Sequence, residues 1–156
     1  RYPERAQEEW ARVFRAKLGL AREEEGDAEL AIRLLEVMAG ARADFTNVFR
    51  GLADGTARDW FADRGPFEAW EAGWQARLAR EEGDVPARLK AANPAVIPRN
   101  HRVEEAIQAA LGGDLGPARA LHAALSAPFA DPDAATRPYT RPPEESEIVQ
   151  ATFCGT

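Results

Sequence analysis

The stretch from Asn93 to Asp114, NPAVIPRNHRVEEAIQAALGGD, predicts an irregular connector followed by an amphipathic helix. Asn93 precedes a proline, whose ring disfavours helical geometry in the residue before it. Asn100 stands where an N-cap is expected, because its side-chain oxygen can accept a hydrogen bond from an orphan amide of the first helical turn. Apolar residues then recur at helical spacing from Val103 to Leu111, and two glycines follow them. The stretch therefore places a polar corner, Arg99-Asn100-His101, at the start of a helix.

Similar periodicity predicts helices along the rest of the chain. They are expected at residues 4–18, from Asp27, from Asp44, from Pro66, at residues 86–92 and at residues 114–126. Asp27 and Asp44 are expected to act as N-caps, and Pro66 occupies a first-turn position where its missing amide does no harm. Helices of this length joined by short loops indicate an all-α fold, a small multi-helix domain.

The helix that starts at Pro66 carries the largest apolar side chains. Phe67, Trp70, Trp74 and Leu78 recur on one of its faces. Aromatic side chains bury the most surface per residue, so we expect this helix to anchor the core. The two tryptophans could instead stack on a base or nucleotide. Core packing is favoured over that alternative because the same apolar face continues to Leu78.

The composition of the chain changes at Ala127. Five prolines between Pro128 and Pro143 interrupt any helix there. A segment of this kind is extended and builds no core of its own. We therefore expect two parts, a helical region at residues 1–126 and an extended proline-rich docking tail at residues 127–156. Apolar residues spaced along the tail favour its lying across a neighbouring surface.

Charge and cysteine content narrow the class of protein. The net charge is −6, and acidic residues are interleaved with the arginines, which argues against nucleic acid as a partner. No apolar run approaches the roughly 20 residues of a membrane span, so no membrane partner is expected. Cys154 is the single cysteine, which excludes an internal disulfide and favours a reducing, cytoplasmic compartment. The chain begins with Arg1 and is treated as a possible fragment.

The sequence supplies no recognisable set of catalytic, cofactor-binding or metal-binding residues. Ser126 and Ser146 lack the glycine-framed turn of a nucleophile elbow. His101 and His122 share no metal-binding spacing, and no glycine-rich phosphate loop occurs. Cys154 remains a candidate redox residue, because a thiol near a chain end is open to oxidants. An incidental free cysteine is the alternative.

Three segments resemble the selenoprotein O / YdiU family, in the order in which that family has them. They are ADFTNVFRGLA at Ala43–Ala53, NPAVIPRNHRVEEAI at Asn93–Ile107 and TFCGT at Thr152–Thr156. The resemblance implies a pseudokinase-like enzyme that transfers AMP from ATP to Ser, Thr or Tyr hydroxyls of proteins, using Mg²⁺ or Mn²⁺. The family's nucleotide and metal ligands belong to an N-terminal kinase-like part whose motifs are not found here. The resemblance thus implies a non-catalytic C-terminal helical region, with no cofactor of its own.

The resemblance also suggests roles for particular residues. Cys154 is similar in position to the family's terminal cysteine or selenocysteine, which implies redox control through a bond to the catalytic part. Ala151 replaces the first cysteine of the Cys-x-x-Sec pattern. Arg99, Asn100 and His101 are candidates for contact with the missing kinase-like domain, and capping of their own helix is the alternative. The expected partners are that domain and the protein substrates. An independent all-α scaffold or interaction module is the competing function.

Overall fold

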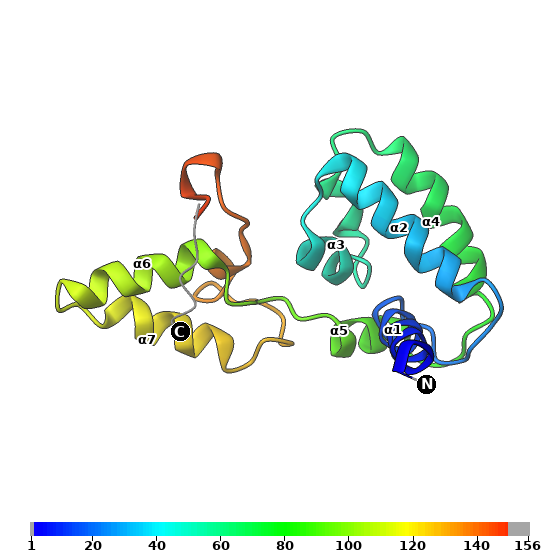
Figure 1. Ribbon diagram of the computed structural model, residues 1–156, viewed down its shortest axis with the longest axis horizontal. Helices are drawn as coiled ribbons and strands as arrows, with labels where there is room; N and C mark the ends of the chain where they lie inside the picture. Colours follow the sequence, from blue (N-terminus) through cyan, green and yellow to red (C-terminus); the bar gives the residue numbers. More distant parts are fainter. Residues whose placement is uncertain (1, 150–156) are drawn as a thin grey trace. The chain divides into compact units, whose positions relative to one another are not determined.

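The computed structural model describes residues 2–149, and all the regular secondary structure in that range is helical. The predicted all-α class is therefore confirmed. Contacts divide the chain into two units, Arg1–Asn93 and Pro94–Thr156, here called unit 1 and unit 2. Figure 1 shows the helices of each unit. The compositional change at residue 127 marks the end of α-helical backbone inside unit 2 and does not coincide with this division.

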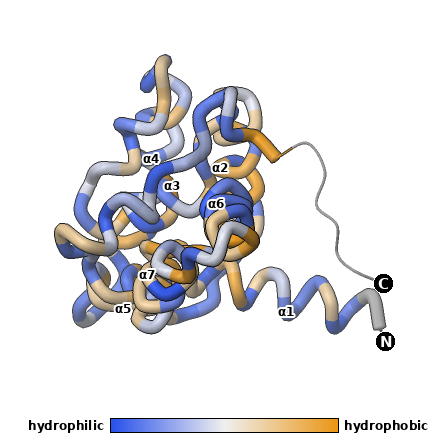
Figure 2. Tube along the Cα trace, turned by 90° about the vertical axis from the view of Figure 1, so that its left-hand side faces the viewer, coloured by the Kyte–Doolittle hydropathy of each residue, from blue (hydrophilic) through white to orange (hydrophobic). Residues whose placement is uncertain are grey.

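Unit 1 is built from five α-helices and one 3-10 turn. They are α1 (Tyr2–Lys17), α2 (Asp27–Ala41), α3 (Phe45–Gly51), η1 (Thr56–Trp60), α4 (Gly65–Leu78) and α5 (Val85–Ala92). Helix α2 lies against α1 and α4, and α3 lies against η1 and α5 (Figure 1). Hydrophilic and hydrophobic positions alternate along α1, as expected for a helix with one face on a core (Figure 2).

Aromatic side chains of α4 form the centre of the unit 1 core, as predicted. Trp70 and Trp74 are only 6% and 2% exposed, and their rings stack with centroids 5.5 Å apart. The indole N–H of Trp70 donates to the carbonyl of Leu30 at 2.8 Å, and that of Trp74 donates to the carbonyl of Leu18 at 3.0 Å. Each buried indole has a partner for its polar atom, which is what burial of tryptophan requires. Neither ring has a face open to a base, so the nucleotide-stacking alternative is wrong.

The helix starts were predicted with mixed success. Asp44 caps α3 as expected, accepting a hydrogen bond from the amide of Asn47 at 2.9 Å, and Pro66 lies in the first turn of α4. Asp27 is not an N-cap. Gly26 holds that position in a left-handed conformation, φ +92°, and Asp27 is the first helical residue, with its side chain buried. Asn100 is not a cap either, because Arg99 precedes α6 with extended geometry and makes no side-chain capping bond.

Unit 2 is a helix pair followed by irregular chain. Its elements are α6 (Asn100–Leu111), α7 (Gly116–Leu125), η2 (Arg137–Thr140) and η3 (Glu145–Glu147). The two α-helices pack against each other, joined by a turn in which Gly113 has φ +89° (Figure 1). The predicted connector is irregular, and the amides of Ala95 and Val96 donate to the carbonyl of Pro128 at 2.7 and 3.3 Å.

The apolar stripe predicted for α6 is not its buried face. Ile107 is 47% exposed and Leu111 is 79% exposed, whereas the α6 side chains that are buried are His101 and Ala106. Helical periodicity shows which residues share a face, but a face is buried only where another element covers it. Within the described part of unit 2, no element covers the face of α6 that carries Ile107 and Leu111.

Candidate functional site

The polar corner predicted from the sequence is mostly internal to unit 2. Arg99 is buried, and its Nη2 donates to the carbonyl of Thr140 at 2.9 Å. His101 is also buried, at 8% exposure. Asn100 is exposed. The structure therefore separates the three residues: two point inward, and one is available to a partner.

Cys154, the predicted redox residue, lies outside the described residues.

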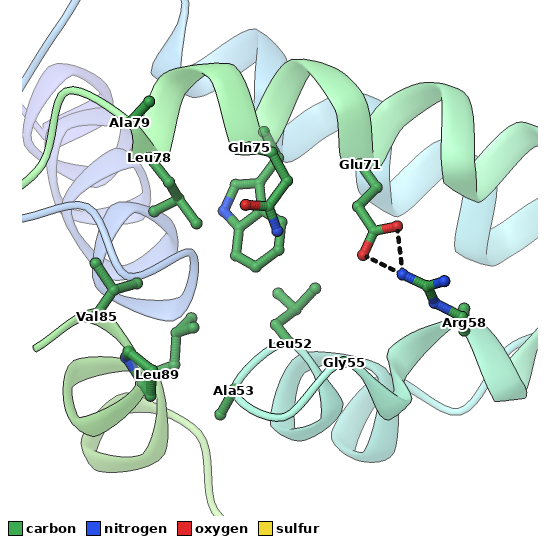
Figure 3. A pocket seen from close by; sticks show the side chains of 12 residues that line it. Leu52, Ala53, Gly55, Arg58, Glu71, Gln75, Leu78, Ala79, Val85 and Leu89 are labelled. Atoms are coloured by element: carbon green, nitrogen blue, oxygen red, sulfur yellow. Dashed lines mark hydrogen bonds and ion pairs between the residues drawn. The ribbon is translucent and has the colours of Figure 1, made fainter.

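Unit 1 has a groove of about 510 Å³ that involves η1, α4 and α5. Its apolar side is formed by Leu52, Leu78, Val85 and Leu89, whose side chains converge in Figure 3. The other end is polar (Figure 3), because a guanidinium and a carboxylate meet there. Arg58 Nη2 donates to both carboxylate oxygens of Glu71, at 3.3 and 3.1 Å. The groove offers apolar contact and one ion pair, but no nucleophile.

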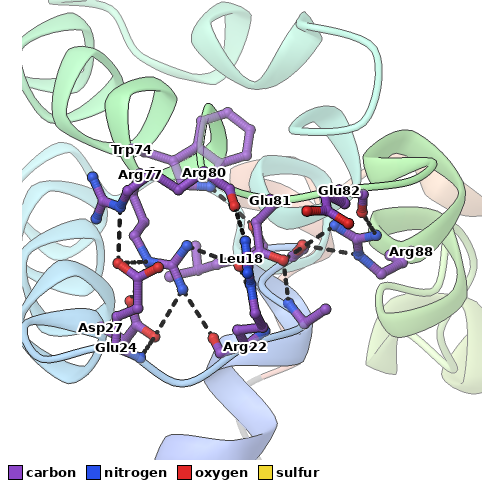
Figure 4. A network of polar contacts seen from close by, with 12 residues as sticks. Leu18, Arg22, Glu24, Asp27, Trp74, Arg77, Arg80, Glu81, Glu82 and Arg88 are labelled. Atoms are coloured by element: carbon purple, nitrogen blue, oxygen red, sulfur yellow. Dashed lines mark hydrogen bonds and ion pairs between the residues drawn. The ribbon is translucent and has the colours of Figure 1, made fainter.

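A buried ion-pair network ties the loop between α1 and α2 to the end of α4 (Figure 4). Arg77 is at its centre: Nε donates to Asp27 Oδ1 at 2.8 Å, and Nη1 donates to Glu81 Oε1 at 2.8 Å. Its Nη2 donates to the carbonyl of Arg22 at 2.9 Å. Burial disfavours the charge of Arg77, but the two carboxylates outweigh this cost and raise its pKa above the ordinary value.

Glu81 completes this network from the other side. Its carboxylate accepts the amide of Ala21 at 2.9 Å in addition to the guanidinium of Arg77. Burial favours its protonated form, yet these donors stabilise the anion more strongly and lower the pKa of Glu81. With several donors and both signs of charge matched, the network holds the loop in one conformation. Because its charged groups are paired with one another, we interpret the network as stabilising the fold.

The sequence did not predict this network, because the interleaved acidic residues and arginines were used there only as an argument against a nucleic-acid partner. One signal was present. Arg77 follows Trp74 by three residues and Trp70 by seven, so it falls on the same helix face as the buried aromatic residues. A charged residue on a buried face requires a buried partner. The partner's identity came only from the fold, since Asp27 is 50 residues away in sequence.

Two further properties of the described residues concern metal ligands and membrane-spanning helices. In residues 2–149 no three His, Cys, Asp or Glu side chains gather as ligands for a metal ion. No helix in the same range combines the length and apolar character needed to cross a bilayer.

The fold and these sites define an all-α chain whose charged clusters are internally paired, and comparison with known proteins identifies its family. The family model described as "Protein adenylyltransferase SelO" matches residues 1–126, so the chain belongs to the SelO family. A "Protein nucleotidyltransferase YdiU" from Ruegeria sp. (strain TM1040) is 53% identical over 155 residues, which are 99% of this chain and 32% of that protein.

Two other relatives, with lower identity to this chain, carry the same description. The YdiU protein of Jannaschia sp. (strain CCS1) is 48% identical over 154 residues, covering 94% of this chain and 32% of the relative. That of Geobacillus kaustophilus (strain HTA426) is 44% identical over 162 residues, covering 99% of this chain and 33% of the relative. The chain thus spans about a third of the length of the curated relatives that it matches.

Proposed function

We propose that this chain is the C-terminal helical region of a SelO-like protein nucleotidyltransferase, and that it supports and regulates a catalytic part formed by the rest of the polypeptide. The whole protein would transfer AMP from ATP to Ser, Thr or Tyr hydroxyls of other proteins, in the cytoplasm. The family membership and the threefold greater length of the relatives support this assignment.

The observation that carries the proposal is the exposed apolar surface of unit 2. Seven large apolar side chains in the described residues are exposed, and five belong to unit 2: Ile107, Leu111, Leu115, Phe129 and Ile148. In residues 94–149 of unit 2 the buried apolar side chains are few and mostly small: Ala95, Val96, Ala106, Leu121 and Ala124. A unit of this size with so little buried apolar surface is marginal by itself.

Ile107 and Leu111 are four residues apart and so share one face of α6, and Leu115 follows in the turn. We call these three residues the α6 strip. Contiguous exposed apolar residues mark surfaces that pack against a partner. The occupant we assign is the remainder of the same polypeptide, because the relatives carry about two thirds of their length outside the matched region.

ATP and Mg²⁺ or Mn²⁺ are the cofactors expected for the whole protein. The described residues do not fit a metal–nucleotide site, since residues 2–149 bring no set of three candidate metal ligands together. Asp27, Glu81 and Glu71 are each already bonded to a guanidinium. We therefore assign the reaction to the remaining part of the protein.

Two regulatory contacts belong to the same proposal. Cys154 would form a redox-sensitive bond with the catalytic part, as the family resemblance implies. Asn100 is the member of the polar corner that could contact the kinase-like part directly, because its side chain is exposed. Arg99 and His101 are buried, so they would influence that contact only indirectly, by stabilising the fold of unit 2.

The test is AMP transfer from labelled ATP to protein, measured for this chain and for a full-length polypeptide that contains it. We expect labelling by the full-length protein and none by this chain. AMP transfer by the chain alone would falsify the proposal. If neither protein transfers AMP and the full-length protein binds no ATP, the competing function, an independent scaffold or interaction module, is favoured.

The α6 strip is tested in the same pair of proteins. Leu111→Gln should lower the melting temperature of the full-length protein by several degrees and leave this chain unchanged, because the side chain is exposed here. Gln108→Ala, at an exposed polar position of the same helix, is the matched control and should be silent in both. An equal effect of Leu111→Gln in both proteins contradicts docking. Concentration-dependent dimers of this chain, lost in Leu111→Gln, would identify a second copy as the occupant instead.

A further inference from the structure

His101 is a buried histidine whose ring has no hydrogen-bond partner. The residue is 8% exposed, and in the part of the chain that the structure describes neither Nδ1 nor Nε2 has a partner. A neutral imidazole can lie in such a place at moderate cost, since one N–H donor and one acceptor nitrogen are left unpaired but no charge is buried. An imidazolium would leave a full charge and two donors unpaired, which costs far more.

Residues 137–147, here called the strap, fold against the start of α6 near this ring. Three contacts come from arginines that flank His101. Arg99 Nη2 donates to the carbonyl of Thr140 at 2.9 Å, and Arg102 Nη2 donates to the carbonyl of Pro138 at 3.2 Å. The guanidinium of Arg102 also lies 5.8 Å from the ring centroid of Tyr139. Two of these contacts are hydrogen bonds to single backbone carbonyls of the strap.

The charges near His101 come from both α6 and the strap. Arg99, just before α6, and Arg102, on α6, flank it, and Arg141 and Glu147 act on it from the strap. The acidic groups are already bonded: Glu105 accepts from Arg102 at 2.8 Å, while Glu147 and Glu144 accept from Arg141 at 2.7 and 3.3 Å. Three arginines thus face three carboxylates. A proton on His101 adds a positive charge that no free carboxylate balances.

We propose that the strap is a proton-sensitive latch, closed over neutral His101 and released from α6 when His101 is protonated. Release gives the imidazolium access to water, and it separates the ring from Arg141. The bonds that break are the ones from Arg99 and Arg102 to the strap carbonyls, which water can replace. No other residue needs to titrate for this release.

The direction of the pH dependence follows from the burial of the ring. Burial lowers the pKa of His101 below 6.5, and Arg102, Arg141 and Arg99 lower it further against the opposing effect of Glu147. The closed strap therefore binds fewer protons than the open one. Its stability is complete above the open-state pKa, near 6.5, and falls as the pH decreases from there to the closed-state pKa.

Hydrogen exchange of the strap amides tests the latch in this chain. Protection factors, corrected for the pH dependence of intrinsic exchange, should fall below pH 6.5 by up to about tenfold per pH unit for a single proton. His101→Phe keeps an apolar ring where the imidazole makes no bonds, so its strap should stay protected at pH 5. His122→Gln, which changes the other histidine on the exposed side of α7, should behave as the unchanged chain does.

Three results would overturn the latch. Strap protection that is the same at pH 5 and pH 8 overturns the latch, and so does a loss at pH 5 that persists in His101→Phe. Should His101→Phe fail to fold, the His101 ring protons can be titrated by NMR in the unchanged chain. A titration midpoint at or above 6.5 would rule the latch out, because the closed form would then favour the proton.

Discussion

Arg77 and Asp27 form a two-bond ion pair closed off from water: Nε lies 2.8 Å from Oδ1, Nη2 lies 3.3 Å from Oδ2, and each residue is 4% exposed. This pair joins the end of α4 to the start of α2 across 50 residues of sequence. It fixes the loop between α1 and α2, whose carbonyls also accept from Arg77 and from Trp74. The pair is therefore the polar counterpart of the aromatic core beside it.

Removal of one partner of this pair should be costly. Asp27→Ala leaves the guanidinium of Arg77 buried with part of its charge unbalanced, and we expect a loss of about 3 kcal/mol in the free energy of unfolding. Urea unfolding followed by tryptophan fluorescence measures it, because all four tryptophans lie in unit 1. Asp59→Ala is the control: its pair with Arg64 is exposed on both sides, so the loss should stay below about 1 kcal/mol. Similar losses in the two variants would contradict the structural role of Asp27.

The lowered pKa of Glu81 predicts how the stability of unit 1 depends on pH in the acid range. Its pKa is lowered in the folded chain, so the folded state binds this proton less readily than the unfolded state does. The stability that Glu81 contributes is complete above the ordinary pKa of 4.5 and is lost as the pH falls below that value through the lowered pKa. Stability measured between pH 6 and pH 3 should therefore decline less steeply in Glu81→Gln, although this variant starts from a lower value. Parallel curves for the two proteins would show that other carboxylates dominate acid unfolding.

Replacement of two glycines of unit 1 by alanine should change the stability of the protein in opposite directions. Gly73 lies inside α4, and a Cβ there would have no atom within 4 Å, so Gly73→Ala should stabilise the helix by about 0.5–1 kcal/mol. A Cβ on Gly51 would lie 2.5 Å from the backbone nitrogen of Ala57, so Gly51→Ala must displace backbone and should destabilise. Thermal unfolding of both variants checks the pair. A stabilising Gly51→Ala would mean that α3 and η1 are not as close as described.

The caps of α3 and α6 offer a similar contrast. Asp44→Ala removes the carboxylate that accepts from the amide of Asn47 and should cost about 1 kcal/mol. Asn100→Ala should cost little, because Asn100 is the exposed first residue of α6 and not its cap. Helicity and urea midpoints measured for both variants decide the matter. A loss for Asn100→Ala equal to that for Asp44→Ala would restore the capping role first expected of Asn100.

Local patterns in the sequence were enough for the helices. Apolar residues at three- and four-residue spacing, Asp44 as a cap and Pro66 in a first turn are interactions within a few residues, so they can be read without the fold. The aromatic face of α4 was also legible, because Phe67, Trp70 and Trp74 are too large and too regularly spaced to be left in water. Three short segments, in the order in which the SelO family has them, led to the correct family.

Tertiary structure alone decided which faces are covered and which charges are paired. The α6 stripe has the same periodicity as the α4 face, yet Ile107 and Leu111 are exposed, since coverage depends on an element elsewhere in the chain. The sequence predicted Asp27 only as a cap, whereas the position of Arg77 in the fold makes it an ion-pair partner. His101 is buried, with Arg141 and Glu147 of the strap among the charges that act on it, although nothing in the helical pattern of α6 sets this residue apart. Sequence fixes a residue's neighbours along the helix, whereas burial and ion pairing arise between segments that the chain brings together only when it folds.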